Sequence, residues 1–208
     1  MSEVPMMHPV TLETVQHYAV SSGMMVHDLD FNKITDAASF VTAVMAAQKN
    51  WLGATSGTTT ISENRKTWSP DHNGLRIPYM GAQYLDTAQP SFKATLVEMT
   101  AGNLQKMSGA ADVVGEGTKA VTITPRASFK ASDYIKTVTW FTNYGTKGII
   151  GATIDNALCV SGLNWKIDDK KVATADVEFM AHAASPVFSD GLPIHYFIYL
   201  NEAASTGA

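Results

Sequence analysis

The sequence is poor in charge, in cysteine and in long apolar runs. Only 16% of its 208 residues are charged, whereas an average soluble chain is about one quarter charged. The single cysteine, Cys159, cannot form an internal disulfide, which excludes a disulfide-stapled scaffold. No apolar run reaches the roughly 18 residues that a membrane-spanning helix needs, so no membrane partner is expected. Ample apolar content, at 45%, also excludes an intrinsically disordered chain.

A basic excess and a leader segment are lacking as well. The formal net charge is -4, whereas a protein that holds nucleic acid by its phosphates normally carries a positive balance. Residues 1–10 lack the basic and then apolar pattern of a signal peptide, and no Asn-x-Ser/Thr acceptor occurs. We therefore expect a reducing cytoplasm at synthesis, with Cys159 as a small buried hydrophobe.

Catalytic and metal-binding motifs are missing too. The six histidines show no HxH or HExxH spacing, and neither a GxSxG nor a GxxxxGK[ST] pattern occurs. His27, Asp28 and Asp30 form the closest polar cluster, for which a solvated turn is a simpler explanation than a cation site. We expect no catalytic residue, metal or cofactor, although carboxylates spread over separate strands leave an unrecognised enzyme open.

The first half of the sequence predicts helices framed by extended segments. The Ala-rich stretch 36–49 lacks Gly and Pro and opens with Asp36 as an N-cap. Its inner face would hold Phe40, Val44 and Ala47. A shorter helix is expected after the capping residue Thr100 and before Gly109. The expected strands are 13–20, 24–28, 58–68, 75–86 with a bend at Pro78, and 91–99.

The second half is more clearly β. The expected strands are 119–126, 134–144, 149–155, 163–168, 172–181 and 192–200. The polar turn 168–171 joins two strands in matching phase, which indicates a hairpin. Leu163, Trp165 and Ile167 share one face of its first strand, and Trp140 and Trp165 are expected in the core. The pattern predicts a mainly β, antiparallel sandwich or barrel, in one domain 1–208 with flexible ends 1–10 and 201–208.

Two of these strands are apolar on both faces. In segment 134–144, Val138 and Trp140 lie opposite Ile135 and Phe141, and segment 192–200 behaves alike. A free antiparallel sheet usually exposes one face to water, so something must cover the second face. Another layer of the same chain and a neighbouring subunit both remain open, the first being the simpler explanation.

Five segments, taken together in this order and spacing, resemble a known family. They are VTLETVQHYAVSSGMMVHDLDF, LGATSGTTTISENRKTWSPDHNGLR with its GAT-G stretch, SFKATLVEMTAGNLQKMSGA, GIIGATIDNALCVSGLNWKIDDKKVATADVEFMAHA, and the closing LPIHYFIYL. They resemble the major tail tube protein of tailed bacteriophages, of the siphophage type with Gram-positive hosts. The stretch 36–49 has no counterpart in that family.

The resemblance implies a fold and an assembly. It implies a β-sandwich flanked by a short helix, with six copies in a ring whose strands join an inter-subunit β-barrel. Stacked rings would form a tube in the virion, assembled in the host cytoplasm. The implied partners are copies of the chain, the tape measure protein, the tail terminator and distal tail proteins, and DNA that passes through the lumen without specific binding.

Candidate residues follow from this expectation. Acidic side chains on strands would repel DNA phosphates in a lumen, and the candidates are Glu13, Glu63 and Asp155. Subunit contacts are expected from the loop 70–90 and the two chain ends. The contact candidates are Pro5, Met7, Arg76, Tyr79, Tyr84, Asn201 and Glu202.

Two alternatives stay open. The tube protein of a related contractile tail or secretion machine would share the fold. A β-sandwich module that binds carbohydrate would instead present a row of exposed aromatic side chains, for which Trp51, Trp68 and Tyr84 are the candidates.

Overall fold

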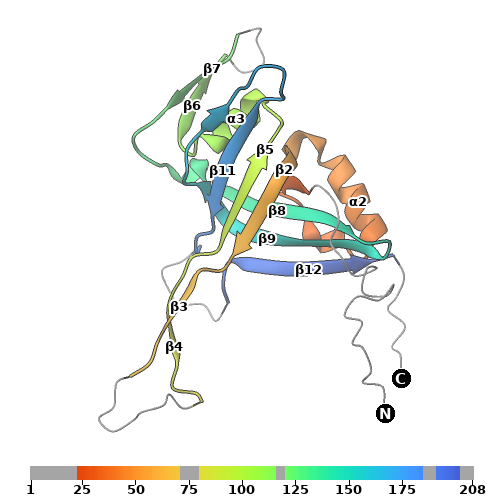
Figure 1. Cartoon of the computed structure of the whole chain (residues 1–208), viewed down its shortest axis with the longest axis vertical. Helices are drawn as coiled ribbons and strands as arrows, with labels where there is room; N and C mark the ends of the chain where they lie inside the picture. The colour runs from red at the N-terminus through yellow and green to blue at the C-terminus, as the bar shows by residue number, and fades with distance from the viewer. Residues whose placement is uncertain (1–22, 71–79, 116–119, 185–190, 202–208) are drawn as a thin grey trace, which may run out of the picture.

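The computed structural model describes residues 23–70, 80–115, 120–184 and 191–201 (Figure 1), and the strand expected at 13–20 lies outside them. The described chain is mainly β. Its strands are β1 Met24–His27, β2 Trp51–Ser62, β3 Arg65–Trp68, β4 Tyr84–Ala88, β5 Ser91–Leu96, β6 Ala111–Val114, β7 Thr122–Pro125, β8 Ile135–Tyr144, β9 Gly148–Cys159, β10 Asn164–Lys166, β11 Thr174–Met180 and β12 Ile194–Leu200. Its helices are α2 Ala37–Ala46 and α3 Ala101–Met107, with single 3-10 turns at Phe31–Lys33, Gln48–Asn50 and Ala131–Asp133.

Six of the strands close into an antiparallel barrel. The sheet order is β10-β11-β5-β2-β1-β8-β9-β12, and β11 also pairs with β9. That second pairing joins Phe179 to Cys159 and Met180 to Leu158, so β11, β5, β2, β1, β8 and β9 form a ring of strands. The predicted mainly β, antiparallel fold is confirmed. Strands β10 and β12 are left outside the closure, each with one neighbour in this sheet.

The barrel interior is the main apolar core. Alternate residues of its strands point inward, and Met25, Leu52, Phe92 and Phe179 are all fully buried there. Cys159 belongs to the same cluster, and burial raises the pKa of its thiol. Its predicted role as a small buried hydrophobe is therefore confirmed.

Helix α2 covers the outer face of the barrel, as Figure 1 shows beside β8 and β12. Asp36 caps the helix by accepting a hydrogen bond from the Ser39 backbone N–H, and the Ser39 hydroxyl accepts one from the Asp36 N–H. Phe40 is fully buried in a second cluster together with Phe141 of β8 and Phe197 of β12. Another layer of the same chain thus covers the Phe141 face of β8 and the Phe197 face of β12, whereas the Tyr196 face of β12 stays exposed.

Several element bounds differ from the sequence predictions. Strand β2 begins at Trp51, seven residues before the predicted start at 58, because Gly53 and Gly57 hid the β pattern. Both glycines have a positive φ, of 116° and 71°, and Gly53 lies opposite Met25, where the β1–β2 register shifts. Strand β9 continues past residue 155 to Cys159, and the four-residue strand β6 was not predicted.

The β10–β11 hairpin forms as predicted, but the position of one aromatic was wrong. Trp165 lies opposite Ala175 and therefore shares a face with the buried Val177. Yet β10 lies beyond the barrel closure, so this face has no opposing layer and Trp165 is 47% exposed. Trp140, in contrast, packs against the main core as predicted.

Candidate assembly surfaces

Strand β12 is an edge strand of seven residues. Its one partner among the described residues is β9, to which it pairs from Ile194 opposite Ile154 to Leu200 opposite Gly148. The backbone groups along its other edge therefore have no strand partner within the described chain. Such an edge is a template for pairing with a further strand.

The side chains of β12 divide into a covered face and an open face. Phe197 and Tyr199 pack under α2, with ring centroids 5.3 Å and 5.5 Å from that of Phe40. On the opposite face, Tyr196 is 58% and Ile198 is 53% exposed. The strand Ile194–Leu200 contains no Asp, Glu, Lys, Arg or Pro. The edge is thus long, apolar and without a permanent charge.

Neighbouring carboxylates anchor β12 on both of its faces. The Nε2 atom of His195 lies 3.1 Å from Oδ2 of Asp155 on β9. On the open face, burial and then the negative charge of Glu63 raise the pKa of the Tyr196 phenol. Glu63 also forms an ion pair with the Nε of Arg65. The two described lumen candidates, Glu63 and Asp155, therefore lie on either side of β12, and each is engaged by a cation or a histidine.

A two-stranded arm extends from the barrel at the end of β2 and the start of β5. It consists of β3 and β4 with their inner loop residues, and we call residues 65–70 and 80–88 the arm. Figure 1 shows it projecting away from the body of the molecule. Trp68 and Tyr84 are paired in the ladder, their rings lie 6.0 Å apart, and each is 57% exposed.

The remaining subunit-contact candidates have different outcomes. Asn201, which follows β12, is exposed; its backbone N–H donates to the carbonyl oxygen of Lys147 at 2.8 Å and its side chain to that of Thr146 at 3.2 Å. The lumen candidate Glu13 and five contact candidates lie outside the described residues. These five are Pro5, Met7, Arg76, Tyr79 and Glu202.

The row of aromatics expected for a carbohydrate module does not form. Trp51 is partly buried against the α2 cluster, and its indole Nε1 donates to the carbonyl oxygen of Val44 at 2.9 Å. Trp68 and Tyr84 lie instead on the arm, with ring planes tilted by 38°. The three candidate residues, Trp51, Trp68 and Tyr84, therefore do not form a flat platform of aromatic rings.

The polar cluster near His27 serves the fold. The Nδ1 atom of His27 lies 2.8 Å from Oδ2 of Asp28, and this hydrogen bond is the main reason that the pKa of Asp28 is lowered. Asp30 accepts hydrogen bonds from the backbone and side-chain nitrogens of Asn32, which caps the following 3-10 turn. Within the described ranges, no three His, Cys, Asp or Glu side chains gather to hold a metal ion.

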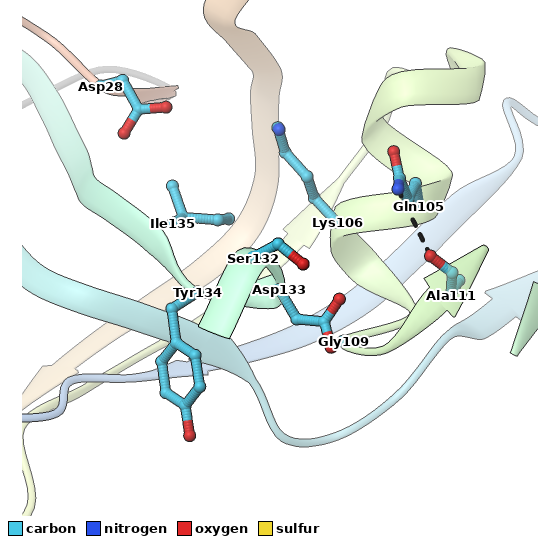
Figure 2. A pocket seen from close by; sticks show the side chains of 9 residues that line it. All are labelled: Asp28, Gln105, Lys106, Gly109, Ala111, Ser132, Asp133, Tyr134 and Ile135. Carbon is cyan, nitrogen blue, oxygen red and sulfur yellow. Dashed lines mark hydrogen bonds between the residues drawn. The ribbon is translucent and has the colours of Figure 1, made fainter. Parts of the chain in front are cut away.

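A small polar pocket of about 220 Å³ lies between α3, the start of β8 and the end of β1 (Figure 2). Figure 2 shows Lys106 and Gln105 reaching from α3, with the Gln105 side chain bonded to the carbonyl oxygen of Ala111. Asp133 pairs with the guanidinium of Arg126 in a largely buried ion pair. Because Asp28 is likewise engaged by His27, both carboxylates of the pocket are committed to neighbours in the chain.

No described helix is both long and apolar enough to cross a membrane. No protein-family model and no curated protein matches this sequence. Among solved structures, the chain is similar to the tube terminating cap of the anti-feeding prophage, at 8% identity over 95% of this chain and 96% of that one, with a TM-score of 0.39. It is also similar to an Hcp protein, at 9% identity over 77% and 88%, with a TM-score of 0.33. At these scores neither likeness carries functional weight, so function is inferred from this chain's own residues.

Proposed function

We propose that this chain is a structural, tube-forming protein whose copies form a ring in which the β12 edge of each copy docks on a different surface of its neighbour. The observation that carries the proposal is the edge of β12 that has no strand partner among the described residues, with Tyr196 and Ile198 exposed beside it. An edge of this kind pairs readily with another strand, and a contact between two different surfaces of identical chains can close into a ring.

The other edge strand of the sheet supports this assignment by contrast. Strand β10 has three residues and carries Lys166, so it is both short and charged. Short length and lysine are the usual means by which proteins keep an edge from pairing. Strand β12 is more than twice as long and has neither protection. Because a permanently bare apolar edge favours aggregation, the assembled state is where β12 gains its cover.

The finer assignment follows the resemblance to phage tail tubes. Six copies form each ring, and stacked rings form a tail tube of the siphophage type that houses the tape measure protein and later conducts DNA. Tail terminator and distal tail proteins bind its two ends. A net charge of -4 suits such a conduit, because DNA phosphates are not attracted to it. Glu63 and Asp155 remain the described candidates for lining the lumen.

The proposal is tested with a charge placed on the edge. Ile198→Lys adds a cation to the open face of β12, and Val41→Lys adds one at a similarly exposed apolar position on α2. For the natural chain and for Val41→Lys, we expect negative-stain micrographs to show rings and sedimentation velocity to show a particle of ring size. For Ile198→Lys, we expect both methods to show monomers. A natural chain that stays monomeric at high concentration, or an Ile198→Lys variant that forms rings normally, overturns the proposal.

A further inference from the structure

A second apolar surface lies at the end of the barrel opposite the arm. It is formed by β10 and its turn into β11, and we call residues 160–173 the flap. Trp165 is 47% and Ile167 69% exposed there. The other exposed apolar side chains of the flap are Val160, Leu163 and Val172. Leu163, Trp165 and Ile167 alternate along β10 and its two flanking residues, so three of these five exposed side chains share one face.

Three charged side chains of the flap, Lys166, Asp168 and Lys171, form ion pairs. The Lys166 ammonium lies 2.5 Å from a carboxylate oxygen of Asp176, and the Lys171 ammonium lies 3.1 Å from Asp168. Lys166 and Asp176 belong to the strand face opposite Trp165, because neighbouring residues of a strand point to opposite sides. The apolar face of the flap is therefore separate from its polar face.

The pairing register places the arm and the flap at opposite ends of the same strands. Strand β5 begins at Ser91, three residues after the arm, and its last residue, Leu96, lies opposite Ala175 at the flap end of β11. Figure 1 shows this separation, with the arm at the lower end of the long axis and the turn leading into β11 at the upper end. One chain thus carries two unlike apolar surfaces that face in opposite directions.

We propose that the arm of one copy docks on the flap of the next copy along the barrel's long axis. This inference rests on the proposed function and deepens it by naming the contact between successive rings. When identical chains repeat head to tail, the arm of every copy meets the flap of the next copy, so both surfaces are buried throughout the assembly. A different protein as partner would leave one of the two surfaces bare.

The size of the two surfaces fits a contact that is repeated. With about 150–250 Å² buried per large aromatic, the half-exposed rings of the arm and the apolar strip of the flap together supply several hundred Å². That is below the roughly 1,200 Å² of a stable isolated interface. A ring presents the contact once per copy, however, and linked contacts reinforce one another. Axial growth therefore depends on rings having formed first.

The test uses one variant at each end. Trp68→Asp disables the arm and leaves the flap intact, whereas Trp165→Asp disables the flap and leaves the arm intact. Each variant alone is expected to form rings but to need about thirtyfold more protein to form tubes, the usual loss for one aromatic hot spot. Trp68→Phe and Trp165→Phe should restore tubes, and circular dichroism checks that all four variants fold.

Mixing the two variants identifies the partners. Rings of Trp165→Asp retain arms, and rings of Trp68→Asp retain flaps, so separately assembled rings mixed in equal amounts should stack in pairs and stop there. Paired rings in the mixture, with single rings in each component, support the inference. Tubes formed by either variant at the natural concentration overturn it while leaving the proposed function standing. Loss of rings in the variants overturns the axial assignment, and a natural chain without rings overturns both proposals.

A cross-link provides a readout that is independent of particle shape. The native Cys159 is buried, so introduced cysteines can be addressed selectively. Leu85→Cys on the arm and Ile167→Cys on the flap, mixed and treated with a short bis-maleimide, should give mainly mixed dimers. Leu85→Cys mixed with Val41→Cys, which is exposed on α2, serves as the matched control. Equal yields from the two mixtures contradict the arm–flap contact.

Discussion

The ring of Phe40 meets the ring of Phe141 edge to face, with centroids 4.9 Å apart and planes at 76°. This contact joins α2 to the outer face of β8, and Phe40 also touches the rings of Phe197 and Tyr199 on β12. One side chain therefore holds the covering helix to both the barrel and its outlying edge strand. Edge-to-face geometry of this kind is favoured by the quadrupoles of the rings.

Removing that side chain should weaken the fold strongly. Phe40→Ala leaves a cavity between α2 and the sheet, and we expect a loss of about 3–5 kcal/mol in the free energy of unfolding. The measurement is urea denaturation followed by circular dichroism. Val41→Ala, one position along the helix but half exposed, should change stability by less than about 0.5 kcal/mol. Similar losses for the two variants would show that α2 is not anchored through Phe40.

Gly151 should not tolerate a larger residue. A Cβ atom at this position would lie 2.4 Å from the carbonyl oxygen of Trp140 and 2.6 Å from Cζ of Phe197. Since the carbonyl belongs to the β8–β9 ladder, it cannot move aside without a loss of pairing. We expect Gly151→Ala to lower the free energy of unfolding by about 1–3 kcal/mol or more.

The matched control for Gly151 is Gly102→Ala in α3. A Cβ at Gly102 meets no atom within 4 Å, and alanine favours a helix over glycine by about 1 kcal/mol. Thermal unfolding should therefore show a lower melting temperature for Gly151→Ala and an equal or higher one for Gly102→Ala. A melting temperature for Gly151→Ala at or above that of the natural chain would refute the close approach.

The hydroxyl groups of Thr139 and Thr153 form a buried pair, 2.9 Å apart between β8 and β9. Replacing one by valine leaves the other hydroxyl buried without its partner, which costs about 1–3 kcal/mol. Replacing both removes the unmet group, so the double variant should be more stable than the sum of the single effects predicts. A double-mutant cycle by urea denaturation measures this, and strictly additive losses would contradict the pairing.

The pH dependence of stability should contain a contribution from Asp28. The hydrogen bond from His27 is the main reason that the pKa of Asp28 in the folded chain lies below its ordinary value of 3.8. A lowered folded-state pKa stabilises the fold above the unfolded pKa, and that contribution is lost as the pH falls through the folded pKa. The stability gap between the natural chain and Asp28→Asn should therefore shrink below about pH 4.

The measurement for Asp28 is the urea midpoint of the natural chain and of Asp28→Asn, taken from neutral pH down to about pH 2. A gap for Asp28→Asn that stays constant over the same range would count against the coupling to His27.

Much of the fold could be predicted from local patterns. The cap at Asp36, the cap at Thr100 and the hairpin turn at 168–171 each depend on residues close in sequence, and all three form. Only the part of β2 from residue 58 onward was predicted. Gly53 and Gly57 adopt a positive φ that glycine allows, but glycine has a low β propensity and so obscured the start of the strand.

The candidate surfaces were less accessible to sequence reasoning. The alternation of Leu163, Trp165 and Ile167 is the same for a buried face and for an exposed one. Only the tertiary closure between β9 and β11 decides that β10 lies outside the barrel. The aromatic Tyr196 could be placed on a strand, but its exposure depends on which strands lie beside β12.

The pairing of β9 with β11 allows the barrel to close within one chain. The barrel core is therefore complete without a neighbouring copy. In the proposed assembly, growth then starts only above a threshold concentration set by the two intermolecular contacts, as in crystallisation. A preformed template that presents a complete ring of flap-like surfaces would lower that threshold concentration. Such a template would therefore determine where a tube begins.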